Sequence, residues 1–217
     1  MSPAVRGQGS TERGLSRIAE AHDLLQRVGE VGHGEHVAWL AGRLFDASAA
    51  LHGLGAAERE LLICAGLLHD VGVSVSFEGH HKHSRDIILQ ADLPSFTDRQ
   101  RRMMACLARY HRKAGPSPAH SAFADLKPAD QRTVTKLAAL LRVADGFDRE
   151  HGHVVKRLRL VQTGEDEWTL YIESPWSLAT ALWAADRKRD VFEAVFGVRL
   201  RIVEQPDGRA VSQHRFP

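Results

Sequence analysis

The stretch Leu61–Gly72, with the sequence LLICAGLLHDVG, is the most informative part of this chain of 217 residues. Almost every residue before His69 is apolar, so a helix here is predicted to be buried on all sides. Gly72 is a residue type at which such a helix ends. Burying the carboxylate of Asp70 costs free energy unless a cation or hydrogen bonds compensate. Asp70 is therefore expected either to bind a cation or to cap a neighbouring helix.

Helical periodicity continues on both sides of this stretch. Val37, Leu40, Ala41, Leu44 and Phe45 have the spacing of one buried helix face. Further helices are expected over residues 15–25, 82–90, 98–112 and 128–148, with Thr97 or Asp98 as the cap of the third. The first two thirds of the chain are thus predicted to form a helical bundle.

The pattern changes near Val154. The segments VVKRLRLVQ and WTLYIES alternate as strands do and are separated by the turn sequence TGEDE, which predicts a hairpin. A helix over residues 176–196 and a strand VRLRIVE follow. The predicted fold is mainly α, a helical bundle followed by a small α+β domain of about three strands and one helix. We expect a disordered tail at 1–14, the helical domain at 15–152, the α+β domain at 153–204 and a second tail at 205–217.

Composition limits the class of protein. Apolar residues at 43% and charged residues at 26% are ordinary globular values. No apolar run approaches the roughly 20 residues that span a bilayer, and the N-terminus lacks the apolar core of a signal peptide. We therefore expect a cytoplasmic protein without a membrane partner. Cys64 and Cys106 lack CxxC spacing and are predicted to be buried apolar residues.

Two statements about partners follow from the C-terminal segment. Its tryptophans are not interleaved with basic residues on one strand, so nucleic-acid binding is not expected. The segment is expected to cover the bundle or to support a homodimer.

The chain contains 13 histidines, and we look for candidate metal ligands among them. Several fall on or beside predicted helices, together with aspartates, and imidazole and carboxylate groups suit borderline or hard divalent cations. His33, His80 and His81 lie close to these residues in sequence, and we expect them to be exposed loop histidines. The candidate ligands, in chain order, are His36, His69, Asp70, His83, His111 and Asp145.

The order H…HD…H…H…D, with HD inside LLHDVG, resembles the HD superfamily of metal-dependent phosphohydrolases. The segments HHKHSRDIIL, MACLARYHRK, LAALLRVADGFDR and LWAADRKRDVFEAVFGVRLRI resemble the C-terminal half of the exopolyphosphatase/guanosine pentaphosphatase (Ppx/GppA) family. This likeness covers roughly residues 15–204. It implies a helical HD domain followed by a small α/β domain, in agreement with the periodicity.

The resemblance also implies roles for the candidate ligands. His36, His69, Asp70 and Asp145 would hold one divalent cation. Asp70 would bridge to a second cation, completed by His83 and His111, and His69 and Asp70 would form the catalytic centre. One or two ions of Mn, Fe, Zn, Co or Mg are compatible with such nitrogen and oxygen ligands.

Basic residues surround His111. Arg109, Arg112 and Lys113 are candidates to hold phosphate oxygens, because guanidinium groups offer forked, charge-assisted hydrogen bonds. The alternative for these residues is a solvated helix surface.

These features predict a metal-dependent phosphohydrolase acting on a phosphate ester or phosphoanhydride, such as a nucleotide, an alarmone or polyphosphate. Full-length exopolyphosphatases carry an actin-like N-terminal half, to which their phosphoanhydride-cleaving site is assigned. The present sequence contains no Gly-rich phosphate loop, so that activity is not carried over. The alternative is a non-catalytic metal- or polyphosphate-binding regulatory module, related to the accessory C-terminal half of those enzymes.

Overall fold

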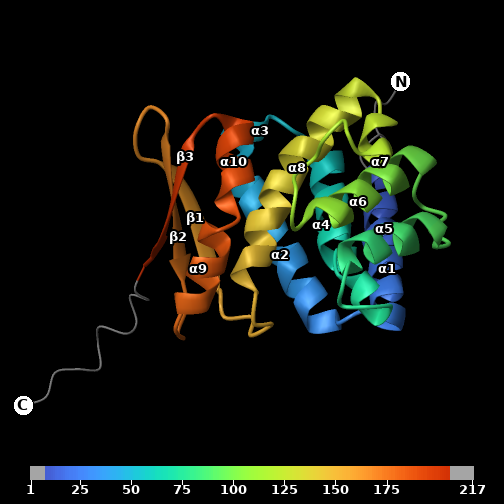
Figure 1. The fold of residues 1–217 in the computed structure, drawn as a ribbon, viewed down its shortest axis with the longest axis horizontal. Helices are drawn as coiled ribbons and strands as arrows, with labels where there is room; N and C mark the ends of the chain where they lie inside the picture. The colour runs from blue at the N-terminus through green and yellow to red at the C-terminus, as the bar shows by residue number, and fades with distance from the viewer. Residues whose placement is uncertain (1–7, 206–217) are drawn as a thin grey trace, which may run out of the picture.

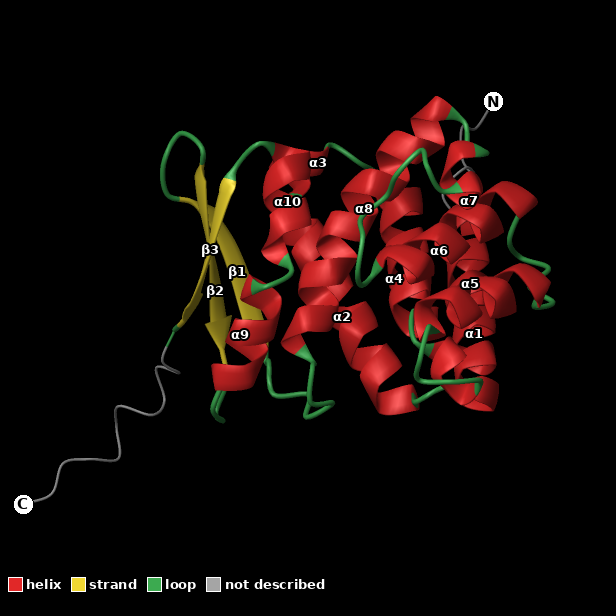
Figure 2. Ribbon diagram, in the orientation of Figure 1, coloured by secondary structure: helices red, strands yellow, loops and turns green. Residues whose placement is uncertain are grey.

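The predicted helices make up most of the molecule (Figures 1 and 2). A computed structural model describes residues 8–205. In the bundle the helices are α1 (Gln8–Val28), α2 (Val31–Ala47), α3 (Ala49–His52), α4 (Ala56–Leu68), the short 3₁₀ helix η1 (Val71–Ser74), α5 (His80–Gln90), α6 (Asp98–Tyr110), α7 (Ser121–Ala124) and α8 (Pro128–Phe147). The remaining elements are β1 (Arg157–Gln162), β2 (Glu167–Glu173), α9 (Ala179–Asp186), α10 (Arg189–Phe196) and β3 (Arg199–Glu204).

Helix α4 lies at the centre of the bundle. It packs against α1, α2, α6 and α8, and most of its side chains are buried, as its apolar sequence predicts. A Cβ atom at Gly66 would lie 2.7 Å from the Cα atom of Ala38, so the glycine permits the close approach of α2 and α4. The C-terminal end of α4, which carries His69 and Asp70, is thereby held inside the bundle.

The turn after α4 is fixed against α5. The backbone N–H of Gly72 donates a hydrogen bond to the hydroxyl oxygen of Ser84 over 2.9 Å. A side chain at Gly72 would overlap the backbone of His80 and Ser84. This contact places the start of α5 directly beside Asp70.

The sheet forms an outer layer at one end of the molecule. Strand β1 pairs antiparallel with β2, as the predicted hairpin requires, and β2 pairs parallel with β3. Helices α9 and α10 lie between the sheet and α8 (Figure 1). Gly146 faces the backbone of Ala185, 2.6 Å from a Cβ built on the glycine, so α8 and α9 approach closely. Buried residues of the sheet and the bundle belong to one continuous core.

The mainly helical fold with a small sheet is confirmed, with differences at two places. The helix expected over residues 176–196 is two helices, separated at Arg187 and Lys188. Helix α1 begins at Gln8, inside the segment that the sequence predicts as a tail. Residues 1–7 and 206–217, also predicted as tails, lie outside the described residues.

Two further observations concern the cysteines and the length and hydropathy of the helices. Cys64 and Cys106 are buried free thiols, as predicted. Within residues 8–205, no helix is both long and apolar enough to cross a bilayer.

Candidate metal centre

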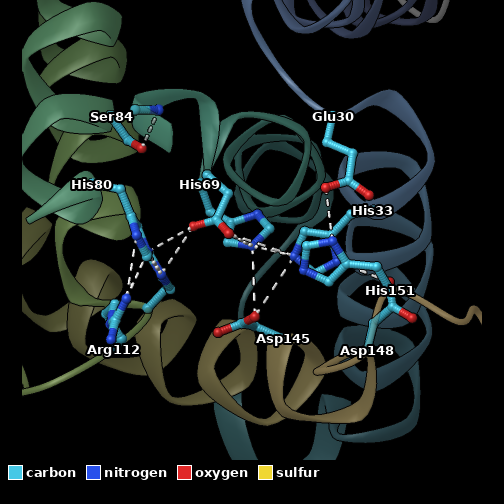
Figure 3. A network of polar contacts seen from close by, with 12 residues as sticks. Glu30, His33, His69, His80, Ser84, Arg112, Asp145, Asp148 and His151 are labelled. Carbon is cyan, nitrogen blue, oxygen red and sulfur yellow. Dashed lines mark hydrogen bonds and ion pairs between the residues drawn. The ribbon is translucent and has the colours of Figure 1, made fainter. Parts of the chain in front are cut away.

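Histidines and aspartates from five segments converge at the end of α4 (Figure 3). His33 comes from α2, and His69 and Asp70 follow α4 directly. His80 opens α5 and His111 follows α6, while Asp145 lies in the last turns of α8. All six residues line or adjoin a cavity of about 930 Å³.

The first cluster consists of His33, His69 and Asp145. The Nε2 atoms of His33 and His69 lie 3.1 Å apart. The Oδ1 atom of Asp145 lies 3.9 Å from the Nε2 of His33 and 3.7 Å from that of His69. All three residues are buried, and His33 and Asp145 also line the cavity.

The second cluster consists of Asp70, His80 and His111. The Oδ1 atom of Asp70 lies 3.1 Å from the Nε2 of His80 and 3.2 Å from that of His111. Its Oδ2 atom lies 3.8 Å from the Nε2 of His33. The Asp70 carboxylate therefore stands between the clusters, with one oxygen toward each.

The other ring nitrogen of each histidine is held by an acceptor. The Nδ1–H groups of His69, His80 and His111 donate to backbone carbonyls three residues earlier, over 2.7, 2.9 and 2.7 Å. That of His33 donates to Oδ2 of Asp148 over 2.8 Å. Carbonyl and carboxylate oxygens only accept, so each Nδ1 carries a proton and each Nε2 lone pair is available to a ligand.

This arrangement fits a divalent cation. Imidazole Nε2 atoms face each other in pairs, and Oδ1 of Asp70 is buried without a hydrogen bond to any described residue. Lone pairs directed at one another repel unless a proton or a cation lies between them. Four imidazoles with two carboxylates favour a transition metal such as Mn, Fe, Co or Zn over Mg, which prefers oxygen ligands.

His151 extends the first cluster. With His33 and Asp70 it forms a third group of closely spaced donor atoms. Its ring stacks on that of His33 with centroids 3.8 Å apart, and its Nδ1 lies 2.7 Å from Oε2 of Glu30. No pattern in the sequence distinguishes His151 from the other histidines after α8.

The two carboxylates are ionised. Burial opposes the charge of Asp70, but His69, His80 and His111 outweigh it and hold the pKa of this carboxyl well below its usual range. Burial also opposes the charge of Asp145, and Lys188 with His69 holds its pKa well below the usual value. Lys188 contacts Oδ2 of Asp145 directly. The site therefore holds two ionised carboxylates, of which that of Asp145 is paired with Lys188.

The histidines titrate differently from one another. Burial lowers the pKa of His69, but Asp70 and Asp145 more than compensate and raise it to about 9. Burial lowers the pKa of His111 to about 3 and also lowers that of His33. Of His33, His69 and His111, only His69 is protonated at pH 7 without a bound cation.

Metal binding at pH 7 is therefore expected to release about one proton, from His69, because only its neutral form can donate the Nε2 lone pair. Apparent affinity should rise about tenfold per pH unit up to about pH 9. Calorimetry in buffers of different ionisation enthalpy measures the released protons.

The same raised pKa affects the stability of the metal-free protein. Protonated His69 contributes stability that is complete below its unfolded pKa of 6.5 and is lost as the pH rises through about 9. Metal binding that releases no proton at pH 7 would contradict the protonated state assigned to His69.

Four of the six predicted ligands come together: His69, Asp70, His111 and Asp145. His36 does not join them. Its ring stacks near Trp39, its Nε2 is buried without a hydrogen bond to any described residue, and burial lowers its pKa to about 4. His83 also lies apart and lines a separate pocket.

The positions predicted for His36 and His83 are taken by His33 and His80. The expectation that His33, His80 and His81 are exposed loop residues is wrong, since they are only 2%, 3% and 4% exposed.

Of the predicted phosphate ligands, Arg112 and Lys113 line the cavity, whereas Arg109 lines only the separate pocket. The Nη1 atom of Arg112 lies 3.1 Å from Nε2 of His80. Sequence reasoning missed Arg149, Arg187 and Lys188, which line the cavity from the C-terminal third of the chain. The cavity is thus lined both by carboxylates and imidazoles and by a group of basic residues. We call this group the basic rim; it consists of Arg112, Lys113, Arg149, Arg187 and Lys188.

Fold and donors together define a helical protein with a candidate metal centre built from histidine and aspartate. A family model described as Ppx/GppA phosphatase, domain III, matches residues 16–191. The chain belongs to this family, as the resemblance of its sequence motifs indicated.

The pairs of neighbouring histidines allow a direct test of the ligand assignment. His33→Gln is expected to weaken binding of a divalent cation at least about tenfold, because it removes one Nε2 donor, whereas His36→Gln should change it less than about twofold. The same contrast is expected between His80→Gln and His83→Gln. Titration of the chelator-treated protein with Co²⁺, followed by its visible absorption, measures both. Equal losses in His33→Gln and His36→Gln would contradict the assignment.

Proposed function

We propose that this chain is an HD-type, metal-dependent phosphohydrolase that acts on a phosphate ester or phosphoanhydride. One observation carries the proposal. The Nδ1 atoms of His33, His69, His80 and His111 are hydrogen-bonded to acceptors, and each Nε2 lies within 4 Å of a carboxylate oxygen of Asp70 or Asp145, beside a cavity with a basic rim. The membership of the Ppx/GppA family supports phosphate chemistry in general.

Bound cations, basic residues and histidines would each have a different role in such a reaction. Divalent cations, when bound, polarise a phosphoryl oxygen and activate water for attack. Arg112, Lys113 and Arg187 line the same cavity and can neutralise the charge of a phosphate group through charge-assisted hydrogen bonds. The hydrogen bonds of the Nδ1 atoms keep the imidazole rings in place throughout.

The cavity also has an apolar side. Phe77 and Trp183 line it and are 68% and 59% exposed, so their rings are accessible to a ligand. Aromatic faces of this kind stack on flat rings. Among phosphate compounds, a nucleotide or an alarmone fits these surroundings, and polyphosphate would use the basic rim alone.

A panel assay tests the proposal. The purified protein, treated with chelator and reloaded with Mn²⁺, Fe²⁺, Co²⁺, Zn²⁺ or Mg²⁺, is assayed against phosphate esters, nucleotides and polyphosphate. We expect stoichiometric metal by elemental analysis and release of phosphate with at least one ion. Protein that binds no metal and releases no phosphate with any ion would refute the proposal.

A second candidate is a non-catalytic metal- or polyphosphate-binding regulatory module. The contact of Lys188 with Asp145 favours it, because the ammonium group already neutralises one of the carboxylates. The family match to domain III, rather than to a whole phosphatase, points the same way. This candidate requires binding of metal or polyphosphate without turnover of any compound in the panel.

A further inference from the structure

A second pocket, of about 470 Å³, lies beside the metal cavity. It is bounded by the first turn of α5 and by the segment that follows α6. Arg112 and Lys113 line both this pocket and the metal cavity, so the two hollows are neighbours. Nothing in the proposed hydrolase reaction uses the second pocket.

The charge of this pocket is strongly positive. Lys82 and Arg109 line it together with Arg112 and Lys113, and Glu78 is its single acidic lining residue among those the structure describes. None of these four basic groups forms an ion pair with a described carboxylate, although many other arginines of the chain do. Four unpaired cations around one hollow repel one another unless an anion joins them.

The ring of His81 adds a hydrogen-bonding group that no described residue uses. His81 is 4% exposed, lines the pocket and makes no hydrogen bond with any described residue. Its Nδ1 is fully buried and out of a ligand's reach, whereas its Nε2 is not fully buried. An anion in the pocket can therefore accept a hydrogen bond from Nε2 of His81.

The backbone contributes to the same hollow. Helix α5 has 11 residues and begins after Gly79, which has no side chain to cap it. Helix N-termini attract anions through free N–H groups and the helix dipole. Lys113 has a positive φ of 56°, a conformation that costs free energy for a residue with a side chain and that places its backbone at the pocket wall.

We propose that this pocket binds a phosphate group, independently of the metal centre. The ligand is a tetrahedral oxyanion held by Lys82, Arg109 and the ring of His81, none of which lines the metal cavity. It comes either from free inorganic phosphate or from a second phosphate of a longer molecule that passes Arg112 and Lys113. The site does not require turnover at the metal centre.

Binding to metal-free protein tests this pocket. The full-length, chelator-treated chain is titrated by calorimetry with inorganic phosphate and with pyrophosphate. Arg109→Gln should bind at least one of the two anions about tenfold more weakly, because it removes one charge-assisted hydrogen bond. Arg102→Gln, an exposed arginine on the same helix and outside both pockets, is the matched control and should bind as the native chain does.

The comparison of anions identifies the source. Weaker binding of inorganic phosphate in Arg109→Gln assigns the pocket to the free ion, and weakening confined to pyrophosphate assigns it to a longer phosphate compound. The exposed Lys82→Gln repeats the test should Arg109→Gln fail to fold. The proposal is overturned if neither anion binds at millimolar concentration. It is also overturned if binding requires added metal, or if both pocket variants bind as the native chain does.

Discussion

Asp70→Asn is expected to remove divalent metal from the protein and to lower phosphohydrolase activity by at least about 1,000-fold, or about 4 kcal/mol of transition-state stabilisation. Asp70 has one oxygen toward each donor cluster, so its loss affects both at once. The low pKa of this carboxyl means that the substitution deletes a real negative charge at any pH above 5 or so. The amide keeps nearly the same shape, and the fold should persist.

Asp86→Asn is the matched control. Asp86 lies on α5, near the second cluster in sequence, but its half-exposed carboxylate pairs with Arg85 outside the cavity. It should keep native metal content and activity. Elemental analysis, activity with saturating metal and circular dichroism of both variants are the measurements. An Asp70→Asn protein that retained metal and full turnover would place the reaction elsewhere in the chain.

Most of the helical fold could be predicted from the sequence, because it depends on local apolar spacing. The burial of α4 and the Thr97 cap of α6 are confirmed, the latter by a hydrogen bond from the backbone N–H of Gln100. The break between α9 and α10 could not be predicted in this way. Residues 186–190 are all charged and include neither Gly nor Pro, so no helix-breaking residue marks the break, and the contact of Lys188 with Asp145 arises only from tertiary packing.

The choice among neighbouring histidines was the weaker part of the site prediction. His33 and His36 are three residues apart on one helix, and the motif order does not distinguish them. What separates them is the direction of the ring relative to the end of α4, which depends on how α2 and α4 pack.

Which basic residues line the metal cavity was also only partly predictable from the sequence. Arg109 and Arg112 are three residues apart in sequence, yet only Arg112 lines the metal cavity. Arg112 follows the end of α6, and its guanidinium turns toward His80. Arg187 and Lys188 reach the same cavity from beyond the sheet hairpin, and no local pattern connects them with it.

Gly72→Ala is expected to destabilise the protein by about 3 kcal/mol, the upper range for overpacking. The added methyl group would overlap the backbone of His80 and Ser84, and backbone cannot move aside as the end of a flexible side chain can. Relief requires α5 to move away from η1, which also breaks the hydrogen bond from Gly72 to Ser84. Because His80 is the first residue of α5, the second donor cluster would open as well.

Denaturant unfolding and metal titration measure these two effects separately. Gly115→Ala is the control, since its methyl group would meet only the side chain of Val191 at an ordinary 3.5 Å, and it should change stability by less than about 0.5 kcal/mol. If Gly72→Ala loses stability and also binds less metal, the packing of η1 on α5 positions His80 for the site. Native stability in Gly72→Ala would mean that the two segments lie farther apart in solution, and the distances between Asp70 and His80 would then no longer support a shared cation.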